Sequence, residues 1–252
     1  MSPPRRFVIG DVHGHFDALV HLFTAIAPSS QDGVYFVGDL IDRGPDSAKV
    51  VEFVIENKYH CLLGNHEQMM LDAIGGGNVS PQLLQAWLYS GGNPTLASYD
   101  HQIPQEHVSW MQRLPLYLDL GDVWLVHAGL DPNLPIAEQG EDQFCWIRDE
   151  FHRHPLPYFP DKLIITGHTI TFTFPNVEPG KLVAGAGWLD IDTGAYHPKS
   201  CWLTALELNA QEVFQVHTMS HAIRHVPLAE AMVVLGADSL HRKRPKKKSW
   251  LG

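Results

Sequence analysis

The stretch Phe7-Val8-Ile9-Gly10-Asp11-Val12-His13-Gly14 passes from a short apolar run into a glycine-bounded pair of polar side chains. The same pattern returns further along the chain as Gly38-Asp39-Leu40-Ile41-Asp42-Arg43-Gly44, Gly64-Asn65-His66-Glu67, His127-Ala128-Gly129 and Gly167-His168-Thr169. Each cluster comes just after an apolar run, as expected where a buried strand ends. Glycine permits the tight turns and close approaches that such strand ends require.

Strand-like and helix-like segments alternate along the chain. Apolar runs predict strands over residues 7–9, 34–37, 61–63, 123–126 and 163–165. Helical spacing of apolar residues predicts amphipathic helices over 16–26 and 46–57, with Asp46 in a capping position. Later segments predict helices over 81–89 and 105–114, and strands over 188–191, 201–208 and 212–216, with a turn at 209–211. The opening β-α-β-α-β order indicates an α/β fold.

The polar clusters are expected to meet at one site. In open α/β sheets, ligands bind just beyond the carboxyl ends of the strands, so residues far apart in sequence can converge there. Together the clusters supply Asp, His, Asp, Asn, His and His, which suit a hydrolytic centre with two metal ions. One cluster alone could equally be an ordinary turn, and the prediction rests on the ordered set.

Length and charge predict one domain with a basic tail. The 252 residues, 44% of them hydrophobic, fit a single α/β domain over 1–240. Six of the 18 Lys and Arg residues stand in residues 242–248, whereas all 28 acidic residues precede them. The tail, 241–252, is expected to be disordered, and contact with nucleic acid, anionic lipid or an acidic partner is possible but not favoured. Bound divalent cations would offset part of the acidic excess.

The sequence also favours a cytoplasmic location. The longest apolar stretches fall far short of the roughly 20 residues that a membrane helix needs, and no apolar segment of a secretion signal precedes residue 7. Cys61, Cys145 and Cys201 are an odd number without metal-binding spacing, and are expected to be reduced core thiols.

The ordered set of clusters resembles the phosphoprotein phosphatase branch of the calcineurin-like metallophosphoesterases, particularly the bacterial and bacteriophage lambda type. Three further pieces carry the resemblance, which runs from about residue 7 to about residue 208: Gln68-Met69-Met70, Trp146-Ile147-Arg148 and Asp192-Thr193-Gly194. It implies a β-sandwich of two mixed sheets flanked by helices, with a dinuclear metal site at the carboxyl ends of the strands.

The resemblance also implies a ligand set for two divalent metal ions. One ion is expected on Asp11, His13 and Asp39, and the second on Asp39, Asn65, His127 and His168, so that Asp39 bridges them. Manganese is the first expectation, with iron or zinc possible, because this mixture of donors does not select one ion. Two ions at roughly 3.5–4 Å can share a water and lower its pKa, which gives a hydroxide positioned to attack phosphorus directly.

Four other residues match catalytic or phosphate-binding positions of the family. His66 matches the general acid that protonates a poor alkoxide leaving group, and Asp42 matches the carboxylate that orients it. Arg43 and Arg148 match phosphate-binding arginines, whose planar fork suits phosphate oxygens. The alternatives are a bystander role for His66, a turn or helix cap for Asp42, and a surface ion pair for Arg148.

These residues predict a metal-dependent phosphomonoesterase that acts on phosphoserine and phosphothreonine in proteins or on small phosphate esters. The closest alternative is a hydrolase of diadenosine tetraphosphate or another nucleotide on the same core. Asp42-Arg43-Gly44 and Glu67 favour the phosphatase, whereas Leu63 weakens that interpretation, because protein phosphatases usually carry arginine there. A non-catalytic metal-binding module is less favoured, since all the expected site residues are present together. A second metal site on His221 and His225, four residues apart as on a helix, is also disfavoured.

Overall fold

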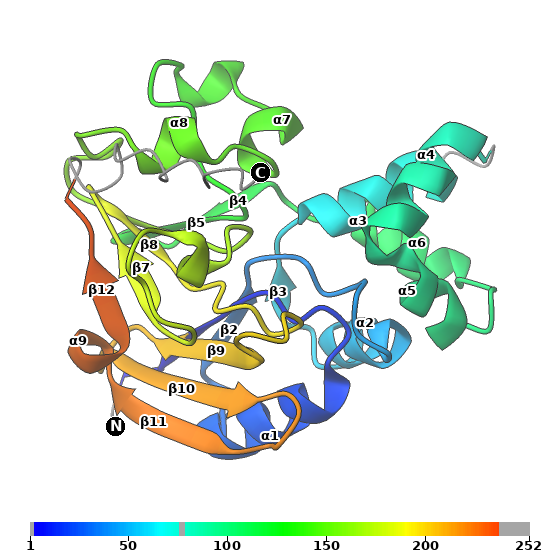
Figure 1. The fold of residues 1–252 in the computed structure, drawn as a ribbon, viewed down its shortest axis with the longest axis horizontal. Helices are drawn as coiled ribbons and strands as arrows, with labels where there is room; N and C mark the ends of the chain where they lie inside the picture. Colours follow the sequence, from blue (N-terminus) through cyan, green and yellow to red (C-terminus); the bar gives the residue numbers. More distant parts are fainter. Residues whose placement is uncertain (1–2, 76–78, 237–252) are drawn as a thin grey trace, which may run out of the picture.

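Within residues 3–75 and 79–236, which the computed structural model describes, the strands form two six-stranded sheets (Figure 1). The first sheet has the order β11-β10-β9-β1-β2-β3, with β1 (Arg6–Ile9), β2 (Gly33–Phe36), β3 (His60–Cys61), β9 (Trp202–Glu207), β10 (Glu212–His217) and β11 (Ile223–Pro227). The second has the order β12-β7-β8-β6-β5-β4, with β4 (Tyr117–Asp119), β5 (Val123–Val126), β6 (Leu163–Thr166), β7 (Leu182–Ala184), β8 (Trp188–Asp190) and β12 (Met232–Val234).

Helices cover the outer faces of both sheets and form a group beside them (Figure 1). The α-helices are α1 (Phe16–Ile26), α2 (Ser47–Glu56), α3 (Asn65–Met70), α4 (Pro81–Trp87), α5 (Asn93–Ser98), α6 (Gln105–Met111), α7 (Glu141–Phe144), α8 (Asp149–His152) and α9 (Leu228–Ala231). Single π-helical turns, η1 (Leu71–Gly75) and η2 (Leu88–Gly92), extend α3 and α4, and short 3₁₀ turns lie at η3 (Ile136–Glu138) and η4 (Thr171–Thr173). None of the described helices is long and apolar enough to cross a membrane.

Alternation along the strands builds three apolar layers. Val8 of β1 and Leu125 of β5 face inward and pack in the core between the sheets. Phe7 and Ile9 face the opposite way and pack with α1 and α2, while Trp124 and Val126 join α7 and α8 on the outer side of the second sheet. Both sheets are mixed. In the first, β1, β2 and β3 pair in parallel whereas β9 is antiparallel to β1. In the second, β5 and β6 pair in parallel whereas β4 is antiparallel to β5. The expected sandwich of two mixed sheets flanked by helices is confirmed.

Several predicted boundaries shift, and some elements escaped prediction. The strand expected over 61–63 ends at Cys61, because the Leu63 amide leaves the sheet and donates to the Pro115 carbonyl at 3.0 Å. The helix expected over 81–89 changes to a π-turn after Trp87. Four short strands, β4, β7, β11 and β12, had no expected counterpart, because three to five residues give little periodic signal.

Three remaining expectations concern histidines, cysteines and the tail. His221 and His225 do not share a helix, since His221 precedes β11 with φ 56° and His225 lies within that strand, where it pairs with Glu212 at 3.0 Å. The three cysteines are buried and unpaired, as expected of core thiols. The basic segment 241–252 lies outside the described residues.

Candidate metal centre

The polar clusters converge beyond the carboxyl ends of β1, β2, β5 and β6, where ligands bind in open α/β sheets. Five of their non-glycine residues take left-handed backbone conformations: His13 (φ 48°), Asp39 (φ 51°), Asp42 (φ 72°), Arg43 (φ 70°) and His168 (φ 67°). Such conformations cost energy in ordinary residues and persist only where surrounding contacts hold them, commonly at functional sites. The loop with the most of them, 38–44, therefore needs a support.

Glu67 is that support. Its carboxylate is fully buried and accepts backbone N–H groups from both neighbouring clusters. Oε2 accepts from Asp39 at 2.9 Å and Gly64 at 3.1 Å, while Oε1 accepts from Leu40 at 2.7 Å and Ile41 at 3.2 Å. Four amide dipoles aimed at one carboxylate fix the loop that carries Asp39 against the start of α3.

Asp39 lies at the centre of two groups of potential ligands. His13, Asp39 and His66 place ligand atoms within 4.8 Å of one another, as do Asp39, His127 and His168. Oδ2 of Asp39 is 3.6 Å from His13 Nε2, and Oδ1 is 3.4 Å from His127 Nε2. Asp39 thus belongs to both groups, and its role as the bridging carboxylate stays a prediction.

Each of the predicted imidazole ligands presents a defined nitrogen to the centre. His13 Nδ1 donates to the Ile41 carbonyl at 2.9 Å and His127 Nδ1 donates to the Val37 carbonyl at 2.8 Å, which leaves both Nε2 atoms unprotonated and facing Asp39. His168 instead turns Nδ1 inward, 2.8 Å from Asn65 Oδ1, which also lies 3.0 Å from His127 Nε2. Backbone partners of this kind fix the tautomer of metal-binding histidines.

The remaining predicted ligand, Asp11, adds a buried and incompletely satisfied carboxylate. Oδ2 accepts the His168 N–H at 3.0 Å, whereas Oδ1 has no hydrogen-bond partner among the described residues. Burial, followed by repulsion from Asp192 and Asp39, raises the pKa of Asp11 well above its ordinary value. A divalent cation would satisfy the orphaned oxygen and relieve this repulsion, so the residues present fit the expected metal ions.

His66 and Asp42 form a buried pair at the edge of this centre. His66 Nδ1 is 2.7 Å from Asp42 Oδ2, and its Nε2 is 4.0 Å from Asp39 Oδ2. The Trp87 indole donates to Asp42 Oδ2 at 2.9 Å, and the Thr95 hydroxyl donates to Oδ1 at 2.6 Å. Burial opposes the charged imidazole, but Asp39 and the bond to Asp42 outweigh it and raise the pKa of His66. The pair favours an imidazole that can carry a proton.

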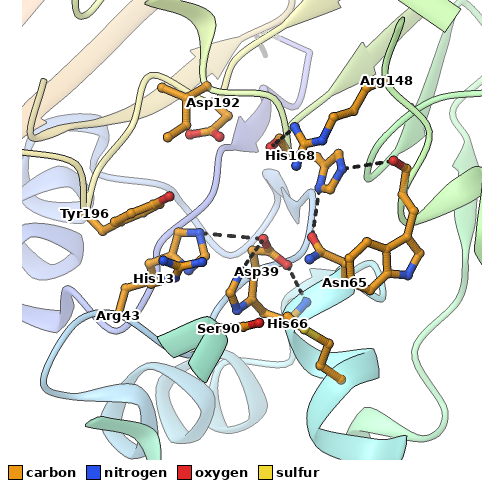
Figure 2. A pocket seen from close by; sticks show the side chains of 13 residues that line it. His13, Asp39, Arg43, Asn65, His66, Ser90, Arg148, His168, Asp192 and Tyr196 are labelled. Atoms are coloured by element: carbon orange, nitrogen blue, oxygen red, sulfur yellow. Dashed lines mark hydrogen bonds and ion pairs between the residues drawn. The ribbon is translucent and has the colours of Figure 1, made fainter. Parts of the chain in front are cut away.

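The two predicted arginines line a cavity of about 200 Å³ in front of these residues. Figure 2 shows His13, Arg43 and Tyr196 on one side of the cavity and Asn65, His168 and Arg148 on the other, with Asp39 between them. The Arg43 guanidinium lies over the Tyr196 ring at 4.9 Å, and Arg148 Nη1 donates to the His168 carbonyl at 3.0 Å. Gly91 packs on the Arg43 side chain with φ 121°, a backbone conformation that is strained in other residues.

Asp192 and Tyr196 are two of the cavity-lining residues for which no role was predicted. Asp192 is buried beside the centre, and Tyr196 also contacts the His13 ring at a centroid distance of 4.7 Å. Asp192 directly follows the predicted strand 188–191, so it could have been predicted as a site residue in the same way as the other polar residues that follow strands. Tyr196 gave no such signal. Leu63 is buried and does not line the cavity, which therefore has no basic group from that position.

Comparison with known proteins agrees with this geometry. Residues 4–189 match the family model of the calcineurin-like phosphoesterases, and the chain belongs to that family. At the level of the fold, it resembles the crystal structure of a cold-active protein-tyrosine phosphatase from a psychrophilic Shewanella species. That likeness has a TM-score of 0.58 at 17% identity and covers 89% of this chain and 80% of the other.

Two curated relatives point to different substrates. A symmetrical bis(5'-nucleosyl)-tetraphosphatase of Neisseria meningitidis is 31% identical over 136 residues, 53% of this chain and 46% of that protein. Serine/threonine-protein phosphatase 1 of Salmonella typhimurium is 37% identical over 117 residues, 45% of this chain and 52% of that protein. The chain therefore spans about half the length of these relatives.

Proposed function

We propose that residues 1–240 act as one cytoplasmic metallophosphatase domain of the phosphoprotein phosphatase branch, which hydrolyses phosphoserine and phosphothreonine in proteins. The observation that carries this proposal is the His66–Asp42 pair, 2.7 Å apart, beside the Asp39 ligand groups and in a cavity with Arg43 and Arg148. A proton donor is needed when the leaving group is an alkoxide, as in serine and threonine esters.

The residues expected to hold the metal ions are those assigned from the sequence. Asp11, His13 and Asp39 would hold one ion, and Asp39 with Asn65, His127 and His168 would hold the other. When bound, two divalent ions, with manganese as our first choice, supply Lewis-acid chemistry and a water-derived nucleophile at neutral pH.

The other side chains bind the phosphate and handle the proton. Arg43 and Arg148 approach the cavity from opposite walls, where they can bind oxygens of a terminal phosphate dianion. As the ester bond between phosphorus and oxygen breaks, His66 donates a proton to the departing oxygen, while Asp42 holds the ring orientation and stabilises its charged form.

His66→Asn with substrates of two leaving groups tests this role. Hydrolysis of a phosphoserine peptide should fall about 10²- to 10⁴-fold, the usual contribution of a positioned acid. Hydrolysis of p-nitrophenyl phosphate should fall much less, because nitrophenolate leaves without protonation. Metal content, measured on the same samples, controls for damage to the centre. Equal losses on both substrates with intact metal content would refute the general-acid role.

Hydrolysis of a dinucleoside tetraphosphate is the second candidate, favoured by the Neisseria relative and by Leu63. Parallel measurements of kcat/KM on a phosphothreonine peptide and on diadenosine tetraphosphate decide between the two. We expect the higher value on the peptide. A clear preference for the dinucleotide would overturn our first choice and leave the metal centre and the roles of the arginines in place.

A further inference from the structure

Behind the cavity wall lies a second His and Asp pair with no role in the chemistry above. His152, at the end of α8, is 2% exposed, and Asp190, at the end of β8, is fully buried. His152 Nε2 and Asp190 Oδ2 are 3.6 Å apart, and neither atom has a hydrogen-bond partner among the described residues. Buried polar atoms without partners are uncommon and call for an explanation.

The hydrogen bonds around this pair imply a shared proton. His152 Nδ1 is 3.0 Å from the Arg148 carbonyl oxygen, which can only accept, so Nδ1 carries the hydrogen. In a neutral imidazole Nε2 is then an acceptor, and it faces a carboxylate oxygen, which is also an acceptor. A proton on one of the two atoms removes the clash and leaves the pair without net charge.

Each member of the pair also holds one wall of the cavity. His152 bonds the backbone of Arg148, whose Nη1 in turn donates to Thr169 Oγ1 at 2.9 Å and to the His168 carbonyl. Asp190 Oδ1 accepts the backbone N–H of Asp192 at 2.9 Å, and Asp192 lines the cavity. A link through the interior therefore joins the two segments that carry Arg148 and Asp192.

Aromatic rings hold the imidazole in this orientation. The rings of Phe151, Phe174 and Trp188 lie 5.2, 5.0 and 4.7 Å from the His152 ring, all in edge-to-face or steeply inclined geometry. A ring enclosed in this way cannot turn to another partner without repacking its neighbours. The direction of both nitrogens is therefore fixed by the core.

We propose that His152 and Asp190 are positioning residues that share a proton and, through the Arg148 carbonyl and the Asp192 amide, fix the spacing of the two walls around the bound phosphate. The proposal rests on the proposed function, since it assigns phosphate binding to Arg148. Neither residue touches the substrate.

The test is a double-mutant cycle between His152 and Arg148. His152→Phe keeps an aromatic ring but removes both nitrogens, and it should raise KM for p-nitrophenyl phosphate and Ki for inorganic phosphate about five- to tenfold, equivalent to one hydrogen bond. The value of kcat should change much less, as expected when binding common to ground and transition states is lost. In an Arg148→Ala background the same substitution should change both constants by less than about twofold, since it acts through Arg148.

Two further variants sharpen the result. Asp190→Asn can still accept from Asp192 and can donate an amide hydrogen to His152 Nε2, so it should bind phosphate nearly as the parent protein does, whereas Asp190→Ala should resemble His152→Phe. His154→Phe, two residues further along the chain, is the matched control, because its Nδ1 bonds the Leu156 carbonyl and should leave Ki unchanged. If His152→Phe does not fold, His152→Asn takes its place in the cycle.

The outcomes separate this proposal from the proposed function. If Arg148→Ala raises Ki but His152→Phe does not, or does so equally with and without Arg148, the positioning role is wrong and the phosphatase proposal stands. If Arg148→Ala itself leaves Ki unchanged, the phosphate-binding role of Arg148 and the inference built on it both fail.

Discussion

Glu67→Gln should destabilise the protein far more than its isosteric shape suggests. Each carboxylate oxygen of Glu67 accepts two backbone N–H groups, so an amide in either orientation turns two of the four acceptor contacts into facing donors. An unsatisfied buried donor costs about 1–3 kcal/mol, so we expect a loss of about 2–6 kcal/mol in the free energy of unfolding.

Urea denaturation in the presence of a chelator measures this loss without a contribution from metal binding. Burial and repulsion from Asp39 raise the pKa of Glu67 to about 7, so the comparison is made near pH 8.5, where the parent side chain is ionised. Glu141→Gln is the control, since that exposed carboxylate accepts from the Gln68 amide at 2.7 Å, and its substitution should change stability by less than about 0.5 kcal/mol.

If the free energy of unfolding of Glu67→Gln lies within about 1 kcal/mol of the parent value, the supporting role of Glu67 is refuted, because one unsatisfied donor alone exceeds that value. A second measurement extends the argument to the site. If the Glu67 carboxylate holds Asp39 in its left-handed conformation, Glu67→Gln should also bind Mn²⁺ more weakly in calorimetric titration, whereas Glu141→Gln should bind it normally.

Three other predictions follow from buried charges and ring contacts. Burial lowers the pKa of His152 to about 3 and raises the pKa of Asp190 well above its ordinary value, in line with the proton that the geometry requires the pair to share. Above about pH 6.5 the unfolded pair holds no proton. The free energy of unfolding should therefore fall by about 1.4 kcal/mol per pH unit from that point until the folded pair loses the shared proton. Asp190→Asn should remove that slope in urea titrations, and an unchanged slope would place the proton elsewhere. Tyr196→Leu removes the ring beneath the Arg43 guanidinium and should raise KM for p-nitrophenyl phosphate about two- to fivefold. Tyr196→Phe keeps the ring and should leave KM unchanged. Equal effects of the two substitutions would assign the change to the hydroxyl group. Mn²⁺ at about one hundred times its dissociation constant should raise the free energy of unfolding by about 2.7 kcal/mol, and Asp39→Asn should lose most of that gain, unless the ion binds elsewhere.

Much of the fold could be predicted because its early strands are continuous apolar runs and its first two helices show a helical period of apolar residues. The strands and helices at the start of the chain were found almost to the residue, since each buried strand is followed by glycine and a polar side chain. The edge strands β4 and β12 could not be found in this way, because three half-exposed residues carry no period and depend on pairing with neighbours.

In the candidate site, too, some residues could be predicted from the sequence and others could not. The sequence-predicted ligands, together with His66, Asp42 and Arg43, come together because they follow strands or stand in short motifs of fixed length, whereas Arg148 reaches the cavity from the connection between α7 and α8. The buried supports were not predictable. In the sequence, Glu67 indicates only a resemblance to the phosphatases. The positions of His152 and Asp190 along the chain do not indicate that the Nε2 and Oδ2 atoms of these residues lie 3.6 Å apart.

The segment from α4 to α5 contacts the site through three separate groups. The Trp87 indole and the Thr95 hydroxyl hold Asp42, while the Gly91 carbonyl accepts the Arg43 N–H at 3.0 Å. His66, through Asp42, and Arg43 therefore depend on the same segment, which also lines the cavity at Ser90. With the roles proposed for His66 and Arg43, a substitution that displaces this segment will alter kcat and KM together, so substrate preference and catalytic rate are expected to evolve together.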